Sequence, residues 1–262
     1  MTGKTILVTG AAGFIGSHTA ATLLARGDRV VGLDNLNDYY DPARKRANLQ
    51  ELSQLPGGAD RFTFVEGDIR NRELVKSLFV KHGFSAVAHL AAMAGVRISV
   101  EDPWLYYDVN LTGTLNLLDA CREHGNPNFV LASTSSAYGN TKVVPFVETD
   151  AADRPLAPYP ASKRSAELLG FSYHHMHGLD FTALRFFTVY GPRGRPDMLA
   201  YKLLDAMRNG QAMPLYNGGQ MHRDWTYVSD IAQGVVSATD RRLGYEIINI
   251  GRGEPVLLAD FV

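Results

Sequence analysis

Short apolar runs alternate with amphipathic stretches through most of the first 190 residues of the chain. The runs are rich in β-branched residues and continuously apolar, so strands formed from them would be buried on both faces. We predict strands at residues 5–9, 29–33, 62–65, 86–90, 129–132 and 181–185, and helices at 14–25, 72–81, 104–121 and 159–173. This repetition predicts an α/β fold with a doubly wound parallel sheet, helices on both of its faces and right-handed crossovers.

The sequence changes character after Gly191. Short segments punctuated by Pro and Gly run to Asp224, followed by a helix-like stretch at 228–239 and a strand-like stretch at 246–250. We expect residues 1–189 to form the main domain, with 229–250 returning to it, and residues 190–228 and 251–262 to form a smaller, interleaved lobe. In sheets of this kind, ligands bind at the carboxyl ends of the strands.

Charge and cysteine content exclude several classes of function. Lys and Arg number 26 and Asp and Glu 27, so the net charge of −1 offers no basic field to hold nucleic acid or an anionic membrane. The single cysteine, Cys121, forbids an intramolecular disulfide and a cysteine-cluster metal site, and it suits a reducing cytoplasm. The eight histidines show no metal-binding spacing, so no metal is expected.

Residues 5–25 form a stretch of 21 residues without a charged side chain, long enough to suggest a membrane span. Nine of them are Gly, Ser, Thr or His, and neither a basic region nor a small-residue cleavage site flanks an apolar block. We therefore expect no membrane segment and a cytoplasmic protein.

Three glycines, Gly10, Gly13 and Gly16, lie between the first predicted strand and the first predicted helix. Glycines at this spacing permit a tight turn, close approach of the backbone to a pyrophosphate and close helix–sheet packing, while the N–H groups of the helix start face the anion. The alternative is a loop that merely requires positive φ. The strand–turn–helix context favours a dinucleotide site.

Acidic residues end the next two predicted strands. Asp34 follows Gly16 by 18 residues and suits the 2′-hydroxyl of an adenosine ribose. Because a carboxylate there repels a 2′-phosphate, we expect NAD in preference to NADP. Asp68 and Ile69 would flank the adenine, although an Asp at a strand end is as often a helix cap.

Tyr159 and Lys163 are four residues apart in the segment YPASK, so a helix places them on one face. Such a pair is commonly an ordinary feature of an amphipathic helix. However, the segment LASTSSAYG at residues 131–139 delivers a cluster of hydroxyls to the ligand edge of the sheet. A tyrosine acting as a base near neutral pH needs its pKa lowered by roughly three units, which a neighbouring ammonium and a nicotinium charge could supply.

With these motifs the chain resembles the extended short-chain dehydrogenase/reductase superfamily over essentially its whole length. Residues 32–41 (GLDNLNDYYD), 89–97 (HLAAMAGVR) and 185–198 (RFFTVYGPRGRPDM) are similar to the UDP-glucuronate 4-epimerase group within it. The resemblance implies a Rossmann fold, NAD as the cofactor, and epimerisation of UDP-glucuronate to UDP-galacturonate through a transient 4-keto sugar.

The resemblance also implies roles for individual residues. Tyr159 corresponds to the general base, Lys163 to the residue that holds the nicotinamide ribose and tunes the tyrosine, and Thr134 to the hydroxyl that binds the sugar 4-oxygen. The expected cofactor-binding residues are Gly10, Gly13, Phe14, Ile15, Gly16, Asp34, Asn35, Asp68, Ile69, Leu90, Ala91, Ala92, Asn110, Tyr159 and Lys163. Asn110 is expected to support the catalytic helix.

Substrate binding requires donors for a pyrophosphate and a carboxylate. The expected substrate-binding residues are Arg97, Ser135, Ser136, Thr188, Arg195 and Arg223. Any single loop arginine is as readily a solvated surface charge. His89 is expected to pack at a strand end, and Trp104, Tyr106 and Tyr107 are expected to pack rather than to bind a ligand.

Alternative activities stay open at this point. Related 4,6-dehydratases carry an Asp-Glu pair after the threonine and decarboxylases a glutamate at the position of Ser136, so Thr134-Ser135-Ser136 makes a dehydratase unlikely. A UDP-glucose/galactose 4-epimerase, a UDP-glucuronate decarboxylase and a non-catalytic NAD-binding relative are the other candidates. Such a relative would tend to lack Tyr159 or Lys163.

The resemblance implies two further properties. The stretches at 104–121 and 159–173 are similar to the helices through which this superfamily forms homodimers. Family members usually continue well past the position of Val262, so the chain is expected to be a fragment or a shortened protein with an incomplete substrate lobe.

Overall fold

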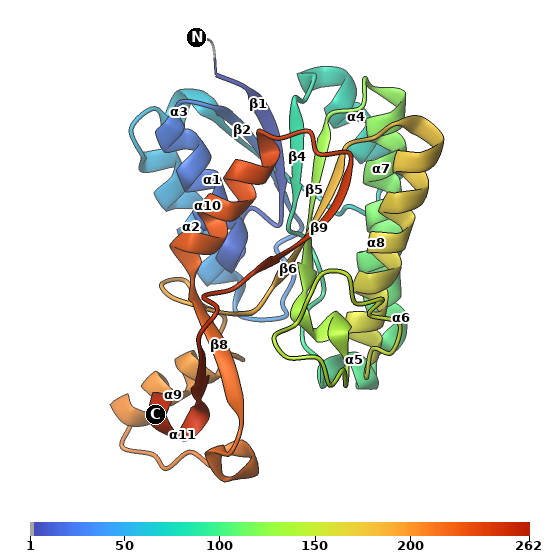
Figure 1. The fold of residues 1–262 in the computed structure, drawn as a ribbon. Helices are drawn as coiled ribbons and strands as arrows, with labels where there is room; N and C mark the ends of the chain where they lie inside the picture. The colour runs from blue at the N-terminus through green and yellow to red at the C-terminus, as the bar shows by residue number, and fades with distance from the viewer. Residues whose placement is uncertain (1–2) are drawn as a thin grey trace.

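Seven parallel strands form the central sheet of the computed structural model, which describes residues 3–262 (Figure 1). Their order is β3 (Phe62–Glu66), β2 (Arg29–Asp34), β1 (Thr5–Thr9), β4 (Ala86–His89), β5 (Asn128–Thr134), β6 (Phe181–Phe186) and β9 (Tyr245–Ile250). Strand order reverses between β1 and β4, which creates the crevice where such sheets bind ligands. The predicted doubly wound α/β fold is confirmed.

Helices cover both faces of the sheet, as continuously apolar strands require. One face carries α1 (Phe14–Arg26), α2 (Pro42–Gln54), α3 (Gly58–Arg61) and α10 (Val228–Thr239), and the other carries α4 (Arg72–His82), α7 (Gly113–Glu123) and α8 (Pro158–His177) (Figure 1). Two apolar clusters fill the interfaces. Leu23 of α1 and Val235 of α10 are buried in one, and Leu78 of α4 and Leu117 of α7 in the other.

A second, three-stranded sheet lies below the first in Figure 1, in the order β10 (Pro255–Leu257), β8 (His222–Tyr227), β7 (Thr188–Tyr190). α9 (Leu199–Arg208), η3 (Tyr216–Gly219) and α11 (Leu258–Phe261) belong to the same part of the chain. Because α10 and β9 return to the main sheet between β8 and β10, the two parts are interleaved. The boundaries proposed from the sequence stay a prediction, and residues 1 and 2 of the first unit lie outside the described residues.

The helix predicted at 104–121 is interrupted. α5 (Ile98–Glu101) precedes it, α6 (Pro103–Tyr107) opens it, and a π-helical turn, η1 (Asp108–Thr112), joins α6 to α7. The backbone N–H of Gly113 donates to the carbonyl of Asp108, five residues earlier. Turns of this kind occur frequently at functional sites, and this one contains Asn110.

Two aromatic residues of α6 that were expected to pack, Tyr106 and Trp104, differ in burial. Tyr106 is fully buried, as predicted, whereas the Trp104 side chain is 85% exposed, so the expectation that it packs within the chain is wrong. α6 packs against α8, η1 and α5 and leaves Trp104 exposed to the solvent. No helix within residues 3–262 is both long and apolar enough to cross a membrane.

Candidate functional site

A cleft of about 380 Å³ opens at the carboxyl ends of β1, β2, β4, β5 and β6. The predicted residues that line it are Gly10, Gly13, Phe14, Ile15, Gly16, Asp34, Asn35, Asp68, Ile69, Leu90, Ala91, Ala92, Thr134, Ser135, Ser136, Tyr159, Lys163, Thr188 and Arg195. The topology therefore brings together residues that are up to 185 positions apart in the sequence, from Gly10 to Arg195.

The glycine turn fits the backbone of a dinucleotide. Gly10 has φ +69°, and a Cβ there would lie 2.7 Å from the amide nitrogen of Ala91. A Cβ on Gly16 would lie 1.9 Å from the carbonyl oxygen of Gly10, so both positions require glycine. No side chain caps the start of α1 after Gly13, which leaves its first N–H groups to face a pyrophosphate in the cleft.

Asp34 ends β2 with its carboxylate fixed toward the cleft. Its two oxygens accept hydrogen bonds from the amides of Ala12 (3.1 Å) and Leu36 (2.9 Å), which leaves further lone pairs for a ribose hydroxyl. Burial raises the pKa of Asp34, although these two bonds and the nearby Lys45 ammonium oppose the shift.

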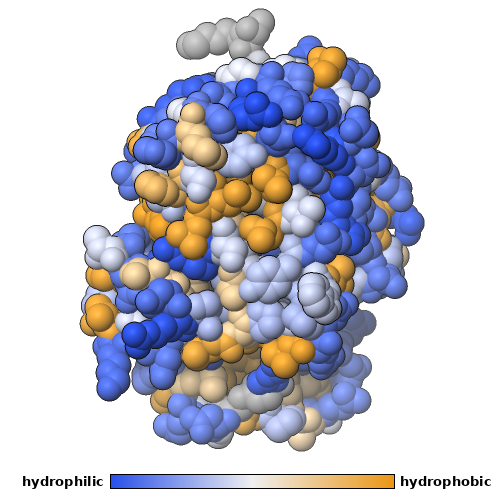
Figure 2. Space-filling view, turned by 90° about the vertical axis from the view of Figure 1, so that its right-hand side faces the viewer, coloured by the Kyte–Doolittle hydropathy of each residue, from blue (hydrophilic) through white to orange (hydrophobic). Residues whose placement is uncertain are grey.

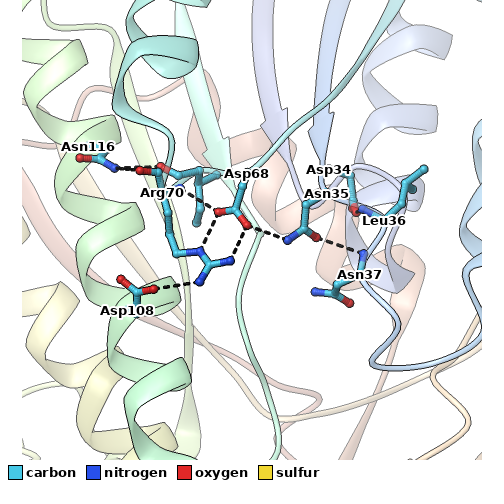
Figure 3. Close-up of polar contacts among 9 residues, drawn as sticks. Asp34, Asn35, Leu36, Asn37, Asp68, Arg70, Asp108 and Asn116 are labelled. Carbon is cyan, nitrogen blue, oxygen red and sulfur yellow. Dashed lines mark hydrogen bonds and ion pairs between the residues drawn. The ribbon is translucent and has the colours of Figure 1, made fainter.

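Asp68 is anchored by a charged and a polar partner where it lines the cleft, at the end expected to hold the adenine (Figure 3). Its carboxylate accepts two bonds from the guanidinium of Arg70, at 3.0 and 2.8 Å, and one from Asn35 at 2.9 Å. The Arg70 hydrogen bond lowers the pKa of Asp68 to about 2. Arg70 also donates to Asp108 at 2.8 Å, which joins the adenine end to the π-helical turn.

Tyr159, Lys163 and Thr134 converge where β5 meets the start of α8. The side chains of Tyr159 and Thr134 line the same part of the cleft, close enough for the Thr134 hydroxyl to act on the pKa of Tyr159. Burial lowers the pKa of Lys163 to about 8, with the carboxylate of Glu167 acting in the opposite direction. Burial raises the pKa of Tyr159, against the opposing effects of Thr134 and Arg195. In the protein alone, burial therefore outweighs the two effects that would lower the pKa of Tyr159.

The residues expected to donate to an anionic substrate line the other part of the cleft. Ser135 and Ser136 lie in η2 (Ser135–Tyr138), Thr188 begins β7, and Arg195 lies in the loop that follows. Arg195 also makes a bidentate ion pair with Asp197, at 2.9 and 2.6 Å, which the sequence analysis did not foresee. Asp197 therefore compensates part of the positive charge that Arg195 offers to a ligand.

Three predicted residues do not line the cleft. Asn110 is buried behind its wall, with its side chain bonded to Met93 and Ser162. Arg97 is exposed just before α5, and Arg223 is exposed on β8, where it donates to the carbonyl of His222. Substrate binding by these two arginines stays a prediction.

Sequence reasoning missed several residues of the cleft. Tyr39, Tyr40 and Lys45 line it, with the Lys45 ammonium 4.9 Å from the centre of the Tyr40 ring. Lys45 also donates to the backbone carbonyl of Asn37 at 2.8 Å. Tyr39 and Tyr40 lie within residues 32–41, a segment that carried the family resemblance. That segment was the signal that could have identified them as residues of the cleft.

A doubly wound sheet, a glycine turn under a dinucleotide-sized cleft and a Tyr–Lys pair at its far end define a Rossmann-type enzyme of the short-chain dehydrogenase/reductase class. The chain belongs to the NAD dependent epimerase/dehydratase family, whose profile matches residues 6–251. Within residues 3–262 there is no group of three or more His, Cys, Asp or Glu that could hold a metal ion.

Individual relatives narrow the comparison. A UDP-glucuronate 4-epimerase of Thermodesulfobacterium geofontis is 47% identical over 95% of this chain and 75% of its own length. UDP-glucuronate 4-epimerase 4 of Arabidopsis thaliana is 43% identical over 99% of this chain, which spans 62% of that protein. The crystal structure of a Bacillus cereus UDP-glucuronic acid 4-epimerase, in complex with UDP-glucuronic acid and NAD, superposes with a TM-score of 0.90 at 37% identity, covering 98% of this chain and 81% of the other.

Proposed function

We propose that this protein is an NAD-dependent epimerase that interconverts UDP-glucuronate and UDP-galacturonate at C4. The observation that carries the proposal is the juxtaposition of the Thr134–Tyr159–Lys163 group with Ser135, Ser136, Thr188 and Arg195 in one cleft. The first group suits oxidation of a secondary alcohol, and the second suits a carboxylate beside it. The names of the two relatives above, and of the Bacillus structure, support the same substrate.

Each protein group has a distinct task in this reaction. Tyr159 removes the proton of the sugar 4-hydroxyl, and Thr134 holds the 4-oxygen in reach. The glycine turn and Asp34 would hold NAD, which would supply hydride-transfer chemistry at the sugar C4 when bound. Lys163 contributes positive charge beside the reacting centre. Between the two half-reactions, the 4-keto sugar must turn over within the cleft.

The carboxylate of the substrate creates a chemical hazard. Oxidation at C4 produces a β-keto acid, which loses CO2 when its C5–C6 bond stands perpendicular to the carbonyl plane. Ser135, Ser136 and Thr188 would hold the carboxylate away from that alignment by hydrogen bonds, together with the guanidinium of Arg195. Because Asp197 shares the charge of Arg195, much of this restraint would come from neutral hydroxyls.

The positions of the carboxylates in the cleft argue against dehydration and decarboxylation. Among the described residues, those that line it are Asp34 and Asp68, both at the adenosine end. No acid of that set stands beside Thr134 to drive an elimination, and no glutamate stands at 136 to repel the substrate carboxylate. These features favour epimerisation over dehydration and decarboxylation.

Product analysis tests the proposal. The protein is incubated with UDP-glucuronate and NAD, and the products are identified by NMR. UDP-galacturonate is expected. Ser136→Glu and Thr188→Ala are expected to raise the share of UDP-4-keto-pentose among the products. Arg195→Ala is expected to weaken the binding of UDP-glucuronate more than the binding of UDP-glucose. Loss of epimerisation without any keto-pentose would refute the restraint of the carboxylate, and conversion of UDP-glucose alone would refute the proposed substrate.

We also propose a cytoplasmic homodimer. The lone cysteine, Cys121, is buried and unpaired, which suits a reducing compartment. The dimer is supported by apolar side chains exposed on neighbouring helices, and its test is given in the Discussion.

A further inference from the structure

His89 is a fully buried, ionisable residue that the proposed mechanism does not use. It ends β4, one residue before the segment that lines the cleft, and its ring lies against Phe129 with centroids 5.8 Å apart. Both of its ring nitrogens have partners. Nδ1 lies 2.7 Å from the hydroxyl of Thr9 at the end of β1, and Nε2 lies 2.9 Å from the hydroxyl of Thr114 in α7.

The partners determine which nitrogen carries the hydrogen. Thr114 has one hydroxyl hydrogen, and it donates this to the carbonyl of Asn110 at 2.6 Å. A carbonyl cannot donate in return, so the Thr114 oxygen must accept from His89, and Nε2 must carry a hydrogen. The Thr9 oxygen accepts from the amide of Ala91 at 3.1 Å, which leaves its own hydrogen to donate to Nδ1.

A neutral ring satisfies every group in this arrangement. The donors then run in one direction: Ala91 to Thr9, Thr9 to His89, His89 to Thr114, and Thr114 to Asn110. Aligned hydrogen bonds of this kind strengthen one another in a buried setting. A cationic His89 would leave the Thr9 hydrogen without an acceptor and would place a second positive charge near Lys163.

The chain of bonds continues to the catalytic helix. The Asn110 side chain accepts from the amide of Met93 at 2.8 Å, and donates to the Met93 carbonyl at 2.9 Å and to the Ser162 hydroxyl at 3.0 Å. Ser162 in turn donates to the backbone carbonyl of Tyr159 at 2.8 Å. The two ends of this chain, Ala91 and Tyr159, both line the cleft.

We propose that His89 is a positioning residue: held neutral with its hydrogen on Nε2, it ties Thr9 to Thr114 and so sets the first turn of α8, with Tyr159, against the cofactor-side wall at Ala91. The kinetic part of this inference rests on the proposed epimerase activity, whereas the protonation state does not.

The protonation state is tested directly on the wild-type protein. Selective labelling of histidine with ¹⁵N and a long-range ¹H–¹⁵N correlation spectrum report which ring nitrogen carries a hydrogen. The His89 signal is assigned by its loss in His89→Gln or, if that variant does not fold, by its shift in Thr114→Ser. A hydrogen on Nε2 alone is expected. A hydrogen on Nδ1 alone, or on both nitrogens, would overturn the proposal.

The positioning role is tested by a matched set of threonine variants. Thr114→Val should lower kcat by about tenfold or more while the KM for UDP-glucuronate changes by less than about twofold, since the chemical geometry is lost and the binding groups are not. Thr114→Ser should restore kcat, because it returns the hydroxyl. Thr239→Val is the control, since Thr239 is buried and donates to a helical carbonyl in α10 at 2.7 Å, away from the cleft.

The outcomes separate the two proposals. Wild-type kcat in Thr114→Val, or an equal loss in Thr114→Ser, would overturn the positioning role. An equal loss in Thr239→Val would also overturn it, because any buried threonine would then serve as well. If the wild-type protein did not convert UDP-glucuronate at all, the proposed function would fail, while the spectrum of His89 would still decide its protonation state.

Discussion

At the scale of single residues, the hydroxyl of Tyr159 is the group on which the chemistry depends. Thr134 and the charge of Arg195 both act on its pKa, and neither group can replace a lost acid–base group. Tyr159→Phe is therefore expected to abolish turnover while NAD affinity changes by less than about threefold, because the hydroxyl contributes little to dinucleotide binding. Comparable turnover in the variant would remove Tyr159 from the mechanism. Fluorescence titration with NAD supplies the binding control.

The pKa of Lys163 predicts a pH dependence. Burial lowers it to about 8, so the ammonium loses its proton as the pH rises through that value. If the reaction needs this positive charge, kcat/KM falls by about tenfold per pH unit on the alkaline side. Lys163→Arg keeps its charge at all accessible pH values, so the fall near pH 8 should disappear even if the maximal rate is lower. A wild-type rate that stays constant well above that pH would contradict the prediction.

At the scale of elements, the β1–α1–β2 unit determines the choice of dinucleotide. The Asp34 carboxylate lies at the end of β2 and lines the cleft, so a 2′-phosphate would meet a negative charge. The wild-type protein is expected to bind NAD at least about tenfold more tightly than NADP, and Asp34→Ser to narrow that ratio. Asp38→Ser is the matched control, since it removes an exposed carboxylate from the same loop. Equal affinities in the wild-type protein would show that Asp34 does not contact the ribose.

The same elements show what the sequence could and could not predict. The strands of the main sheet were predicted to within two residues at every end, because continuous apolar runs bounded by turns favour buried strands in an α/β fold. α2 was missed because it is strongly polar and buries only Lys45, Asn48 and Leu52. The π-helical turn was missed because nothing in the local sequence marks it, whereas the Asn110 bonds to Met93 and Ser162 that accompany it are tertiary. In the site, the motifs identified residues on strand ends and on α8, whereas Lys45 lies on the unpredicted helix α2 and Asp197 in a loop, so both reach their places through tertiary packing.

A buried ion pair joins α8 to β5 and β6 beneath the site. Glu167 accepts two bonds from Arg185, at 3.0 and 2.8 Å, and one from Ser133 at 2.5 Å, and both charged side chains are fully buried. Arg185→Met removes the fully buried cationic partner of Glu167, which keeps the bond from the Arg164 guanidinium at 3.1 Å, and should lower the free energy of unfolding by about 3 kcal/mol. The double variant Glu167→Gln, Arg185→Met should cost less than the sum of the single changes. Urea unfolding of the four proteins measures this, and additive losses would contradict the coupling.

At the scale of the whole molecule, exposed apolar side chains gather on one side. Figure 2 faces the side on which α7 and α8 lie, and it shows hydrophobic surface grouped among polar residues. Leu168 of α8 is 52% exposed, Leu115 of α7 is 40% exposed and Trp104 of the adjoining α6 is 85% exposed. A two-fold contact between copies of this face would bury all three on both protomers, because such an interface uses the same patch twice.

The dimer is tested by introducing charge into this face. Light scattering of the wild-type protein at micromolar concentration should give twice the mass of one chain, and a monomer mass would contradict the proposal. Leu168→Asp and Trp104→Asp should each give the mass of a single chain, because a buried, unpaired carboxylate is strongly unfavourable at an interface. Leu204→Asp is the control, since Leu204 of α9 is 66% exposed but lies in the smaller lobe.

Because α8 carries both Leu168 and Tyr159, a monomeric variant that keeps its fold also reveals whether the partner's helix is needed to hold the catalytic helix in place. If turnover is lost together with the dimer, the partner's helix is needed to hold the catalytic helix. If the monomer keeps full turnover, each chain holds its own site.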